Sequence, residues 1–525
     1  MDPNKTPGED GLTSKILLEV AKILPRFVTA IYNNCLRRNN FPQQWKKARL
    51  VPIIKPEKES SQEVTKFRPI SLLNTGGKVL EKLLINRILH HINTNNQMCN
   101  KQFGFTPQTS TVDAAMSLKN FVEENLNKNR YMVLVSLDIQ GAFDSAWWPA
   151  IMQSLRNFQC PKNLYKLADS YFNQRTATLA VNNIKVDKKV SNGCPQGSCC
   201  GPGFWNIQYN SLLSLESTNH TEIIAFADDL LVITKGNTIL EAENYANIEM
   251  GKIASWARDN KSRFNEQKSK TMLITRRKRR ENKEIHIFLN NKKLEQVNTM
   301  KYLGIVIDTR FTFTQHIDYV TERCTKLINA LSKTAKISWG LSHKALWTIY
   351  NGAVLPLLSY AVPVWISALN KGFNVNKLKR IQRLICIRIA KAYRTVSYES
   401  LCVLTGLTPI HLKLQEIATI HQVKKMNKYE NQNVDLQIGS KGWTHPAKFM
   451  EFQEIKENVN YTYEIFTDRS KSERGVVSEI AIFKKEELIH QMKFRLNNNC
   501  SKNQSEHHAI IKALESITRH NTGDE

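Results

Sequence analysis

Three aspartates form the pattern with the clearest chemical meaning in this sequence. Asp138 follows the apolar run MVLVSL, and Asp228 and Asp229 stand side by side between two further apolar runs. Adjacent carboxylates repel one another and raise each other's pKa, which costs stability unless a cation lies between them. Oxygen donors without a nearby His or Cys favour Mg²⁺, with Mn²⁺ as an alternative ion. Two such ions can activate an attacking hydroxyl and stabilise a departing pyrophosphate, which is the chemistry of nucleotidyl transfer.

Each carboxylate taken alone also has an ordinary explanation. A single aspartate after a strand, such as Asp138, often caps the next helix. Asp-Asp pairs such as Asp228-Asp229 are common in exposed turns. The prediction of a metal centre therefore rests on the three residues as a set.

A glycine- and proline-rich loop is the second candidate for chemistry. Residues 192–202, NGCPQGSCCGP, contain three glycines and two prolines and precede the helix-like run FWNIQYNSLL. Glycines allow the backbone to approach a flat ligand closely. We expect Gln196, next to Gly197, to contact a template base or an incoming nucleotide, although the segment is also compatible with a plain turn.

The elements that position these residues follow from the apolar patterns. The run before Asp138 predicts a strand buried on both faces, and residues 223–227 and 230–233 predict a hairpin with Asp228 and Asp229 at its tip. ARLVPIIKP predicts a strand with Lys55 near its end, and FRPISLLN a second extended piece with Arg68, because residues before proline avoid the helical region.

Helical patterns dominate elsewhere. Residues 76–93 predict an amphipathic helix, and the chain becomes helical beyond residue 309. The basic helix expected at 377–394 would suit contact with a nucleic-acid backbone, or it is solvated helix surface. Residues 345–370 carry no charge over a length that could cross a bilayer. Because Gly352, Pro356 and Pro363 interrupt them, we expect a buried, broken helix and no membrane partner.

Composition limits the class of protein. The 525 residues are too many for one core and predict three or four structural units. A net charge of +27 favours a polyanionic partner such as nucleic acid, or a basic protein of the ribosomal type. The ten cysteines form no CxxC pair and no signal peptide is evident, which predicts reduced thiols, an intracellular location and no zinc site.

Four motifs occur together in a family-specific order. SLDIQGAFD, GCPQGSCCGP, FADD and KYLG follow one another as in the reverse transcriptases of non-LTR retrotransposons, and the resemblance runs from about residue 7 to 430. FPQQWKKARLVPIIKP, FRPISLLN and QFGFTPQTSTVDA resemble the blocks of the family's finger region. The details most resemble a fragment of the Pol polyproteins of type-1 elements, which insert into arthropod ribosomal DNA.

The resemblance implies an α+β right-hand polymerase followed by a partial α/β ribonuclease H-like unit. The expected regions are an N-terminal helical extension (1–45), fingers (46–130), a palm with finger insertions (131–310), a helical thumb (311–430), a linker (431–460) and a partial ribonuclease H-like domain (461–525).

The resemblance also implies roles for single residues. Asp138 and Asp228, with Asp229 beside them, would hold two Mg²⁺ ions, and Phe143 would be the steric gate that excludes a 2′-hydroxyl, unless it is core packing. Arg68 and, less securely, Lys55 would hold the triphosphate, or they form a solvated basic face.

Lys268 matches the lysine that protonates pyrophosphate in the family. Ser262 and Arg263 stand where Gly-Leu is more usual before this motif, and Lys270 is an alternative for the role.

The C-terminal piece predicts three strands, a helix and a second, incomplete site. Asp468 is expected at the end of the first strand and Glu506 early in the helix, where the ribonuclease H family carries two metal-binding carboxylates. Arg469 stands where glycine is usual. We therefore expect this piece to be catalytically incomplete, and Asp468 is equally compatible with an ordinary turn.

The implied reaction is addition of deoxynucleotides to a DNA primer or target 3′ end on an RNA template. Two rivals remain open: an RNA-dependent RNA polymerase, which uses the same carboxylates, and a decayed element copy that only binds nucleic acid. The resemblance implies activity in the nucleus and ribonucleoprotein assembly in the cytoplasm. No endonuclease segment is evident, so we assign target cleavage to other parts of the parent polyprotein. The oligomeric state is left open.

Overall fold

The structure is a computed structural model, and it describes residues 5–54, 67–181, 184–277, 284–332, 341–426, 464–472, 475–484, 487–497, 500 and 502–521. The chain divides into two compact units, Met1–Asp435 and Leu436–Glu525, which are described separately below. Lys55 and the predicted linker at 431–460 lie outside the described residues.

The first unit is built on a five-stranded sheet with the order β11-β8-β3-β7-β6. Its strands are β3 (Tyr131–Leu137), β6 (Thr221–Phe226), β7 (Asp229–Gly236), β8 (Lys270–Ile274) and β11 (Glu295–Gln296). All neighbouring pairs run antiparallel except β11 and β8. The strand predicted before Asp138 is therefore β3, and it lies at the centre of the sheet.

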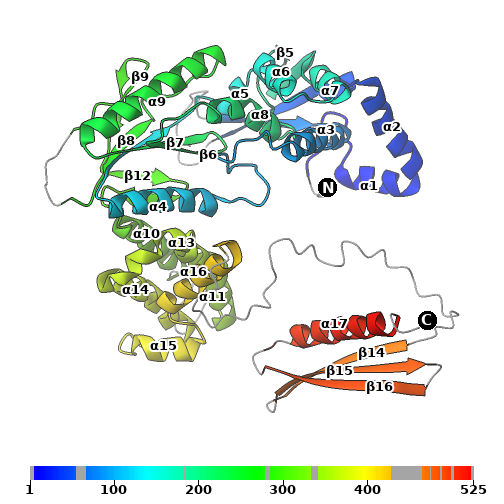
Figure 1. Ribbon diagram of the computed structural model, residues 1–525, viewed down its shortest axis with the longest axis vertical. Coiled ribbons are helices and arrows are strands. Elements are labelled where there is room, and N and C mark those ends of the chain that lie inside the picture. The colour runs from blue at the N-terminus through cyan, green and yellow to red at the C-terminus, as the bar shows by residue number, and fades with distance from the viewer. Residues whose placement is uncertain are drawn as a thin grey trace. The chain divides into compact units, whose positions relative to one another are not determined.

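Helices cover both faces of this sheet (Figure 1). α9 (Ile239–Asp259) packs on β3 and β7, and α4 (Thr111–Asn127) packs on β3 and β6 from the other side. Val133 and Val135 belong to the core on one face, whereas Leu134 belongs to the core on the other. The predicted burial of β3 on both faces is confirmed.

The turn into α9 shows how local sequence starts a helix after a strand. The side chain of Thr238 accepts a hydrogen bond from the Glu241 amide at 3.1 Å, and the Glu241 carboxylate accepts one from the Asn237 amide at 2.8 Å. The arrangement is similar to a capping box, except that the Glu241 carboxylate binds the amide one residue before the N-cap Thr238. The chain therefore leaves β7 directly into the helix that covers it.

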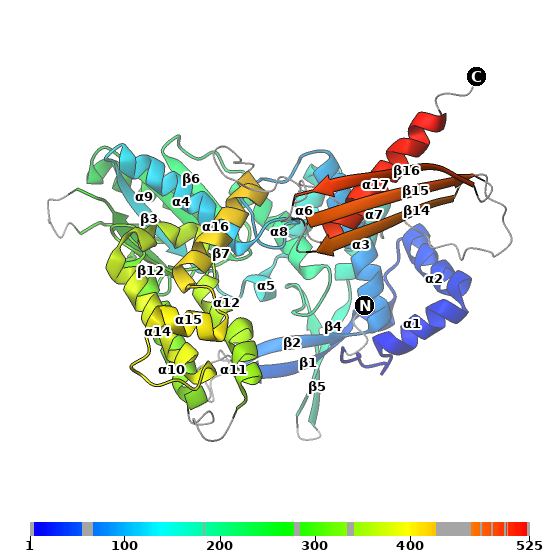
Figure 2. The same ribbon diagram turned by 90° about the horizontal axis from the view of Figure 1, so that it is seen from below.

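A second sheet in the first unit has the order β2-β1-β4-β5 (Figure 2). Its strands are β1 (Lys47–Ile54), β2 (Phe67–Leu73), β4 (Arg175–Val181) and β5 (Ile184–Val190). β1 and β4 run parallel, and the other pairs run antiparallel. The two strands predicted from ARLVPIIKP and FRPISLLN are confirmed as β1 and β2.

Further helices and short strands complete this part of the first unit. The elements are α1 (Ser14–Ile23), α2 (Pro25–Arg38), η1 (Gln43–Lys46), α3 (Thr75–Thr94), α5 (Ala142–Ser145), α6 (Trp148–Asn157), α7 (Lys162–Phe172), α8 (Gly201–Leu213), β9 (Phe288–Leu289), β10 (Lys292–Lys293), β12 (Thr299–Tyr302) and β13 (Ile305–Asp308). The helix predicted at 76–93 is α3, and the first 45 residues contain helices as expected.

The first unit ends in a helical region, as the pattern beyond residue 309 predicts. Its elements are α10 (Thr314–Ser332), α11 (His343–Ile349), η3 (Tyr350–Val354), α12 (Leu355–Ser359), α13 (Val362–Trp365), η4 (Ile366–Asn370), α14 (Gly372–Ile389), α15 (Tyr398–Thr405) and α16 (Ile410–Met426). These helices share one hydrophobic core with the α4 face of the central sheet.

The uncharged segment at 345–370 is buried and broken, as predicted. Val354, Leu358 and Val362 are fully buried in the helical core. Within the described ranges, no single helix has the length and apolar character needed to cross a membrane. The segments His343–Ser359 and Val362–Asn370, bent by 46° where they meet, pass that test together by length and composition alone.

The basic helix predicted at 377–394 is α14, which begins five residues earlier and ends at Ile389. Part of its positive charge is engaged within the protein, since Lys377 forms an ion pair with Asp318. Other cations, such as Arg380, are exposed. One side of α14 therefore packs in the core. Fewer of its Lys and Arg side chains are left for contact with a polyanion than the sequence alone suggests.

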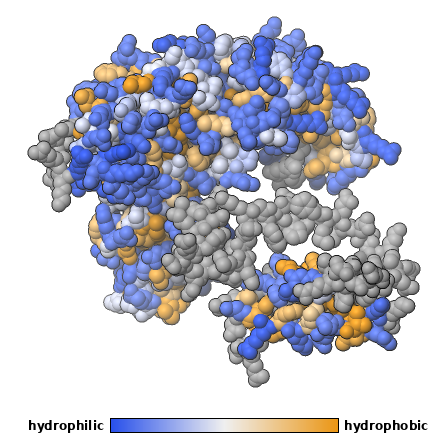
Figure 3. Space-filling view, in the orientation of Figure 1, coloured by the Kyte–Doolittle hydropathy of each residue, from blue (hydrophilic) through white to orange (hydrophobic). Residues whose placement is uncertain are grey.

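The visible face of the first unit is mainly hydrophilic, with scattered apolar patches (Figure 3). Such a surface agrees with the large number of Lys and Arg residues in the chain.

The second unit is a three-stranded antiparallel sheet with one helix. Its elements are β14 (Glu464–Ser472), β15 (Gly475–Lys484), β16 (Glu487–Leu496) and α17 (Lys502–Asn521). Ile480 and Ala509 are fully buried where α17 packs on the sheet. The predicted order of three strands and a helix is confirmed.

His316 in α10 leads to a prediction about acid stability. Its side chain is 1% exposed, and its Nδ1 accepts a hydrogen bond from the Val306 amide at 3.3 Å. Burial lowers its pKa from 6.5 to about 4, because the charged form loses its hydration. The unfolded chain binds this proton more readily, so its stabilising effect is complete above pH 6.5 and is lost as the pH falls towards 4.

The whole loss of stability from this proton is on the order of 3 kcal/mol at pH 4. We expect His316→Asn, which keeps an acceptor near Val306, to remove part of that loss. Urea unfolding between pH 7 and 4 measures it. The exposed His90→Asn serves as the control. An unchanged pH dependence in His316→Asn would show that other groups govern acid unfolding.

Candidate active site

At the end of β3, both main-chain polar groups of Asp138 form hydrogen bonds with one distant turn. The Asp138 amide donates to the Ser269 hydroxyl at 3.2 Å, and its carbonyl accepts from the Asn265 amide at 2.7 Å. Ser269 is fully buried. The position of the carboxylate therefore depends on a turn that lies far along the chain.

The same turn brings Lys268 to Asp138. The Asn265 side chain accepts hydrogen bonds from the amides of Gln267 and Lys268, at 3.1 and 3.2 Å. The Lys268 ammonium then lies 3.4 Å from the Asp138 carboxylate. Lys270, the alternative from sequence, is in β8 and forms an ion pair with Glu295. The structure places Lys268, and not Lys270, beside the aspartate.

β6 and β7 form the predicted hairpin, and the acidic pair lies at its tip. Phe226 pairs with Asp229, which leaves Ala227 and Asp228 as the two turn residues. Ala227 has a left-handed backbone with φ of 57°. Asp228 therefore projects from a tight turn, whereas Asp229 is the first residue of a strand.

Burial and, to a smaller extent, neighbouring acids raise the pKa values of the two aspartates at this tip. Burial raises the pKa of Asp228, and the negative charge of Asp138 adds to the increase. The pKa of Asp229 rises to about 6, first because the carboxylate loses part of its hydration through burial, and then through the negative charges of Asp228 and Asp138. The three carboxylates are thus close enough to repel one another, as the sequence predicts.

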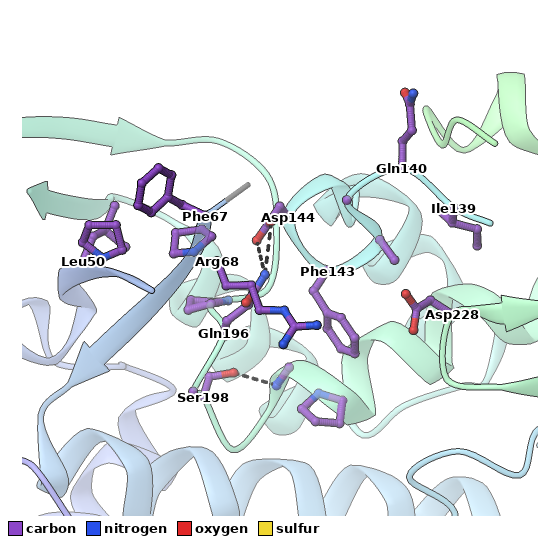
Figure 4. A pocket seen from close by; sticks show the side chains of 18 of the residues that line it. Leu50, Phe67, Arg68, Ile139, Gln140, Phe143, Asp144, Gln196, Ser198 and Asp228 are labelled. Carbon is purple, nitrogen blue, oxygen red and sulfur yellow. Dashed lines mark hydrogen bonds between the residues drawn. The ribbon is translucent and has the colours of Figure 1, made fainter. Parts of the chain in front are cut away.

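One cleft of about 1450 Å³ collects most of the predicted site residues. Its lining includes Asp138, Asp228, Lys268, Phe143, Arg68, Gln196 and Gly197. In Figure 4 the Arg68 guanidinium and the Phe143 ring lie side by side, and Asp228 lies on the far side of the ring from Arg68. The cleft exceeds the roughly 300–1,000 Å³ usual for a small ligand.

Phe143 is held by two aromatic neighbours. Its ring centroid lies 5.8 Å from that of Phe105 and 5.7 Å from that of Trp205. Trp205 is fully buried, whereas Phe143 reaches the cleft. The ring therefore packs against the core and also lines the cleft. This position is compatible with both explanations open from the sequence, a steric gate and core packing.

The glycines of the 192–202 loop serve contacts between main chains. A side chain on Gly193 would meet the Asp144 carbonyl oxygen at 2.6 Å, and one on Gly197 would meet the Ser71 carbonyl oxygen at 2.8 Å. Both glycines also have positive φ. The close approach expected towards a flat ligand is thus made towards β2 and α5, and this fastens the loop to the rim of the cleft.

Asp144 is a site residue that sequence reasoning missed. The Gln196 amide nitrogen donates to both of its carboxylate oxygens at 3.2 Å (Figure 4). Asp144 follows Phe143 directly and also lines the cleft. Its presence in the motif SLDIQGAFD was the available signal. The pair fixes the orientation of the Gln196 side chain.

A buried acid beneath the loop was also missed. Glu81 in α3 is 1% exposed, and its carboxylate accepts a hydrogen bond from the Cys199 amide at 2.6 Å. Burial raises the pKa of Glu81, and the charge of the buried Arg175 partly offsets this increase. No periodic pattern marks this contact, since Glu81 lies among the apolar positions of an ordinary amphipathic helix.

The carboxylates fit a divalent ion by donor type and charge. Asp138 and Asp228 both line the cleft and offer the oxygen donors that Mg²⁺ prefers. Asp229 does not line it, and its charge instead adds to the effect of burial in raising the pKa of Tyr302. Within the described ranges, no group of three or more His, Cys, Asp or Glu residues is arranged to hold a metal. Joint binding of metal by Asp138, Asp228 and Asp229 therefore stays a prediction from the sequence.

The second predicted site needs a correction. Asp468 does not end its strand, because β14 continues to Ser472 and pairs Asp468 with Glu479 of β15. The turn signal in the sequence lies after Ser472, and the antiparallel partner extends the strand to that point. Glu506 lies early in α17, as predicted. In the described part of the second unit, no group of three or more His, Cys, Asp or Glu residues is placed to hold a metal.

Comparison with known proteins identifies relatives of the first unit. Residues 54–307 match the family described as reverse transcriptase (RNA-dependent DNA polymerase). The Pol polyprotein from the type-1 element R1 of Bradysia coprophila is 30% identical over 80% of this chain and 41% of its own length. The RNA-directed DNA polymerase from the mobile element jockey of Drosophila melanogaster is 28% identical over 74% and 42%. The chain thus spans about 40% of the length of these curated relatives.

Likeness to solved structures is weaker. The apo telomerase from Candida tropicalis aligns over 80% of this chain and 73% of its own, with 11% identity and a TM-score of 0.37. A form of that telomerase truncated from its C-terminal domain covers 51% of this chain and 54% of its own, with 13% identity and a TM-score of 0.38. Scores of this size carry no argument about the site.

The repulsion between the acids leads to a prediction about stability. In a chelating buffer at pH 8, Asp229→Asn removes one of the crowded negative charges, so its melting temperature should exceed that of the wild type by roughly 1–3 °C. Excess Mg²⁺ should stabilise the wild type more than the variant, because binding favours the folded state.

Differential scanning fluorimetry with and without Mg²⁺ measures both effects. Asp169→Asn, at an exposed position on α7, is the matched control. A lower melting temperature for Asp229→Asn in chelator would contradict the repulsion between these acids.

Proposed function

We propose that this chain is a reverse transcriptase of the non-LTR retrotransposon kind, which extends a primer 3′ end with deoxynucleotides on an RNA template. The match of residues 54–307 to the reverse transcriptase family and the similarity to the R1 and jockey proteins support this proposal. The primer would be DNA at a target site. The observation that carries the proposal is the convergence of Asp138, Asp228, Lys268, Arg68 and Phe143 on one cleft.

The arrangement supports transfer of a nucleotide. Asp138 and Asp228 would hold Mg²⁺, or Mn²⁺ in its place, with Asp229 nearby. When bound, two such ions would lower the pKa of the primer hydroxyl and offset charge on the departing pyrophosphate. Lys268 offers an ammonium proton and a positive charge at the same end of the cleft, 3.4 Å from Asp138.

The opposite wall of the cleft supports binding of the nucleotide. Arg68 presents a planar guanidinium from β2, a group suited to a triphosphate. Phe143 would exclude a 2′-hydroxyl, and its contacts with Phe105 and Trp205 keep the ring from swinging aside. Gln196 and Gly197 would contact the incoming nucleotide or the template base.

The same proposal assigns the larger regions. Residues 46–130 would be fingers, 131–310 the palm and 311–430 the thumb, with the basic surface of α14 towards the template-primer duplex. The sheet and helix of the second unit would be part of a ribonuclease H-like domain. Work in the nucleus, and ribonucleoprotein assembly in the cytoplasm, would follow from such an element's need to copy RNA into chromosomal DNA.

The test is primer extension with a DNA primer on an RNA template. Asp228→Asn should reduce the extension rate by more than roughly 100-fold, since loss of a residue that only supports a metal ligand already costs 10- to 100-fold. Asp169→Asn should extend at the wild-type rate.

Equal rates for the wild type and Asp228→Asn would refute the polymerase proposal and favour a decayed, nucleic-acid-binding copy. Exclusive use of ribonucleotides by the wild type would identify an RNA polymerase instead.

Sugar selection provides a second test. Phe143→Val should raise ribonucleotide incorporation relative to deoxynucleotides by roughly 10- to 100-fold, because a smaller side chain leaves room for the 2′-hydroxyl. Phe143→Tyr keeps the ring and should retain the wild-type ratio. Single-nucleotide insertion kinetics give both ratios. The same ratio in Phe143→Val and the wild type would assign the ring to core packing alone.

A further inference from the structure

The segment at residues 101–104 behaves as an additional strand beside the acidic hairpin. The Phe103 amide donates to the Ala225 carbonyl at 2.8 Å, and the Ala225 amide donates to the Lys101 carbonyl at 2.9 Å. Gln102 and Ala225 form a parallel bridge. Residues 102–104 begin the motif QFGFTPQTSTVDA, of which only Phe105, beside Phe143, has a role in the site described above.

The side chain of Gln102 binds the turn itself. It is 3% exposed, and its Oε1 accepts the Ala227 amide at 2.9 Å while its Nε2 donates to the Ala227 carbonyl at 3.1 Å. Oε1 also accepts the Gly104 amide at 2.8 Å. One carboxamide therefore engages both main-chain polar groups of the residue that precedes Asp228.

Two further contacts leave Ala227 little freedom. The Trp205 indole donates to the Ala227 carbonyl at 3.1 Å, so this oxygen accepts two hydrogen bonds. A β-carbon on Gly104 would lie 2.1 Å from the Ala227 nitrogen, so only glycine permits the approach.

The turn needs this support because Ala227 has φ of 57°. A residue with a β-carbon is strained in this left-handed region and keeps the conformation only where its surroundings enforce it. The next residue is Asp228, whose carboxylate reaches the cleft. A change of the Ala227 backbone would therefore turn Asp228 away from Asp138.

We propose that Gln102 is a positioning residue, whose carboxamide holds the turn at Ala227 so that Asp228 faces Asp138 in a geometry that can bind a divalent ion. The proposal rests on the proposed function in so far as its effect is read through primer extension. Gln102 touches neither the cleft nor a substrate, and it acts only through the main chain of Ala227.

The chain offers a matched control for a merely structural amide. Asn210 in α8 is 5% exposed, and its side chain accepts the Cys99 amide at 2.7 Å and donates to the Gln97 carbonyl at 3.4 Å. It bonds the main chain of a neighbouring segment as Gln102 does, but that segment, residues 97–99, does not adjoin a residue that lines the cleft. Asn210→Leu and Gln102→Met each replace a buried amide by an apolar group of similar size.

The experiment measures primer extension as a function of Mg²⁺ and deoxynucleotide concentration, together with the melting temperature. Gln102→Met should lower kcat by roughly 10- to 100-fold and raise the half-saturating Mg²⁺ concentration, with KM for the nucleotide nearly unchanged. Asn210→Leu should lower the melting temperature similarly and leave kcat and the Mg²⁺ dependence at wild-type values. Should Gln102→Met not fold, Gln102→Asn keeps the amide but shortens its reach, and it should show the same two changes.

Gln102 variants that lose stability as Asn210→Leu does, with unchanged kcat and Mg²⁺ dependence, would overturn the proposal. If the wild-type chain extends no primer, the proposed function fails and hydrogen exchange decides the role of Gln102. Faster exchange in the peptide covering 225–231 in Gln102→Asn, but not in Asn210→Leu, would support the role of Gln102 in holding the turn at Ala227. Equal exchange in that peptide would overturn it.

Discussion

The constraint on which this structure depends is that like-charged carboxylates must be held near each other at the ends of adjacent buried strands. Burial raises the pKa of Asp228 and the negative charge of Asp138 adds to the increase, so the positions of these two acids need support from other residues. The support is main-chain hydrogen bonding: Ser269 holds Asp138, and Gln102 holds Ala227 beside Asp228. The central sheet, buried on both faces, then prevents the strands from sliding apart. The hydrogen bonds and the packing of the sheet thus offset the unfavourable free energy of the repulsion between the acids.

The features that could be predicted from the sequence have local causes. The apolar run of β3, the two apolar pieces around Asp228-Asp229 and the extended backbone required before Pro69 each act over a few residues. They led to the expected β3, β6–β7 hairpin and β2. The glycine- and proline-rich loop also indicated Gln196, whereas the family motifs added Phe143, which no pattern would single out; both residues line the cleft.

What could not be predicted are contacts between distant segments and the exact ends of strands. Gln102 binds Ala227 across more than a hundred residues of sequence, and Glu81 binds Cys199 over a similar span. Neither Gln102 nor Glu81 changes the pattern of apolar residues in its own segment, so the sequence carries no sign of these contacts. Asp468 shows the second limit, because the length of β14 depends on its pairing with β15 and not on the turn residues alone. Joint binding of metal by the three aspartates stays a prediction: Asp228 lies in the turn and lines the cleft, whereas Asp229 is the first residue of β7 and does not line it.

The central place of β3 has a consequence for synthesis of the chain. β3 pairs with β7 and with β8, whose residues are made about one hundred and more positions later (Leu134 pairs with Ile233 and Met272). Until those strands leave the ribosome, an apolar strand with two open edges has no partner, and such edges invite association between chains. Non-local pairing of this kind is also slow. Translation that pauses before residue 270 would leave β3 half-paired, so yield from expression should depend on chaperones more than on the stability of the finished fold.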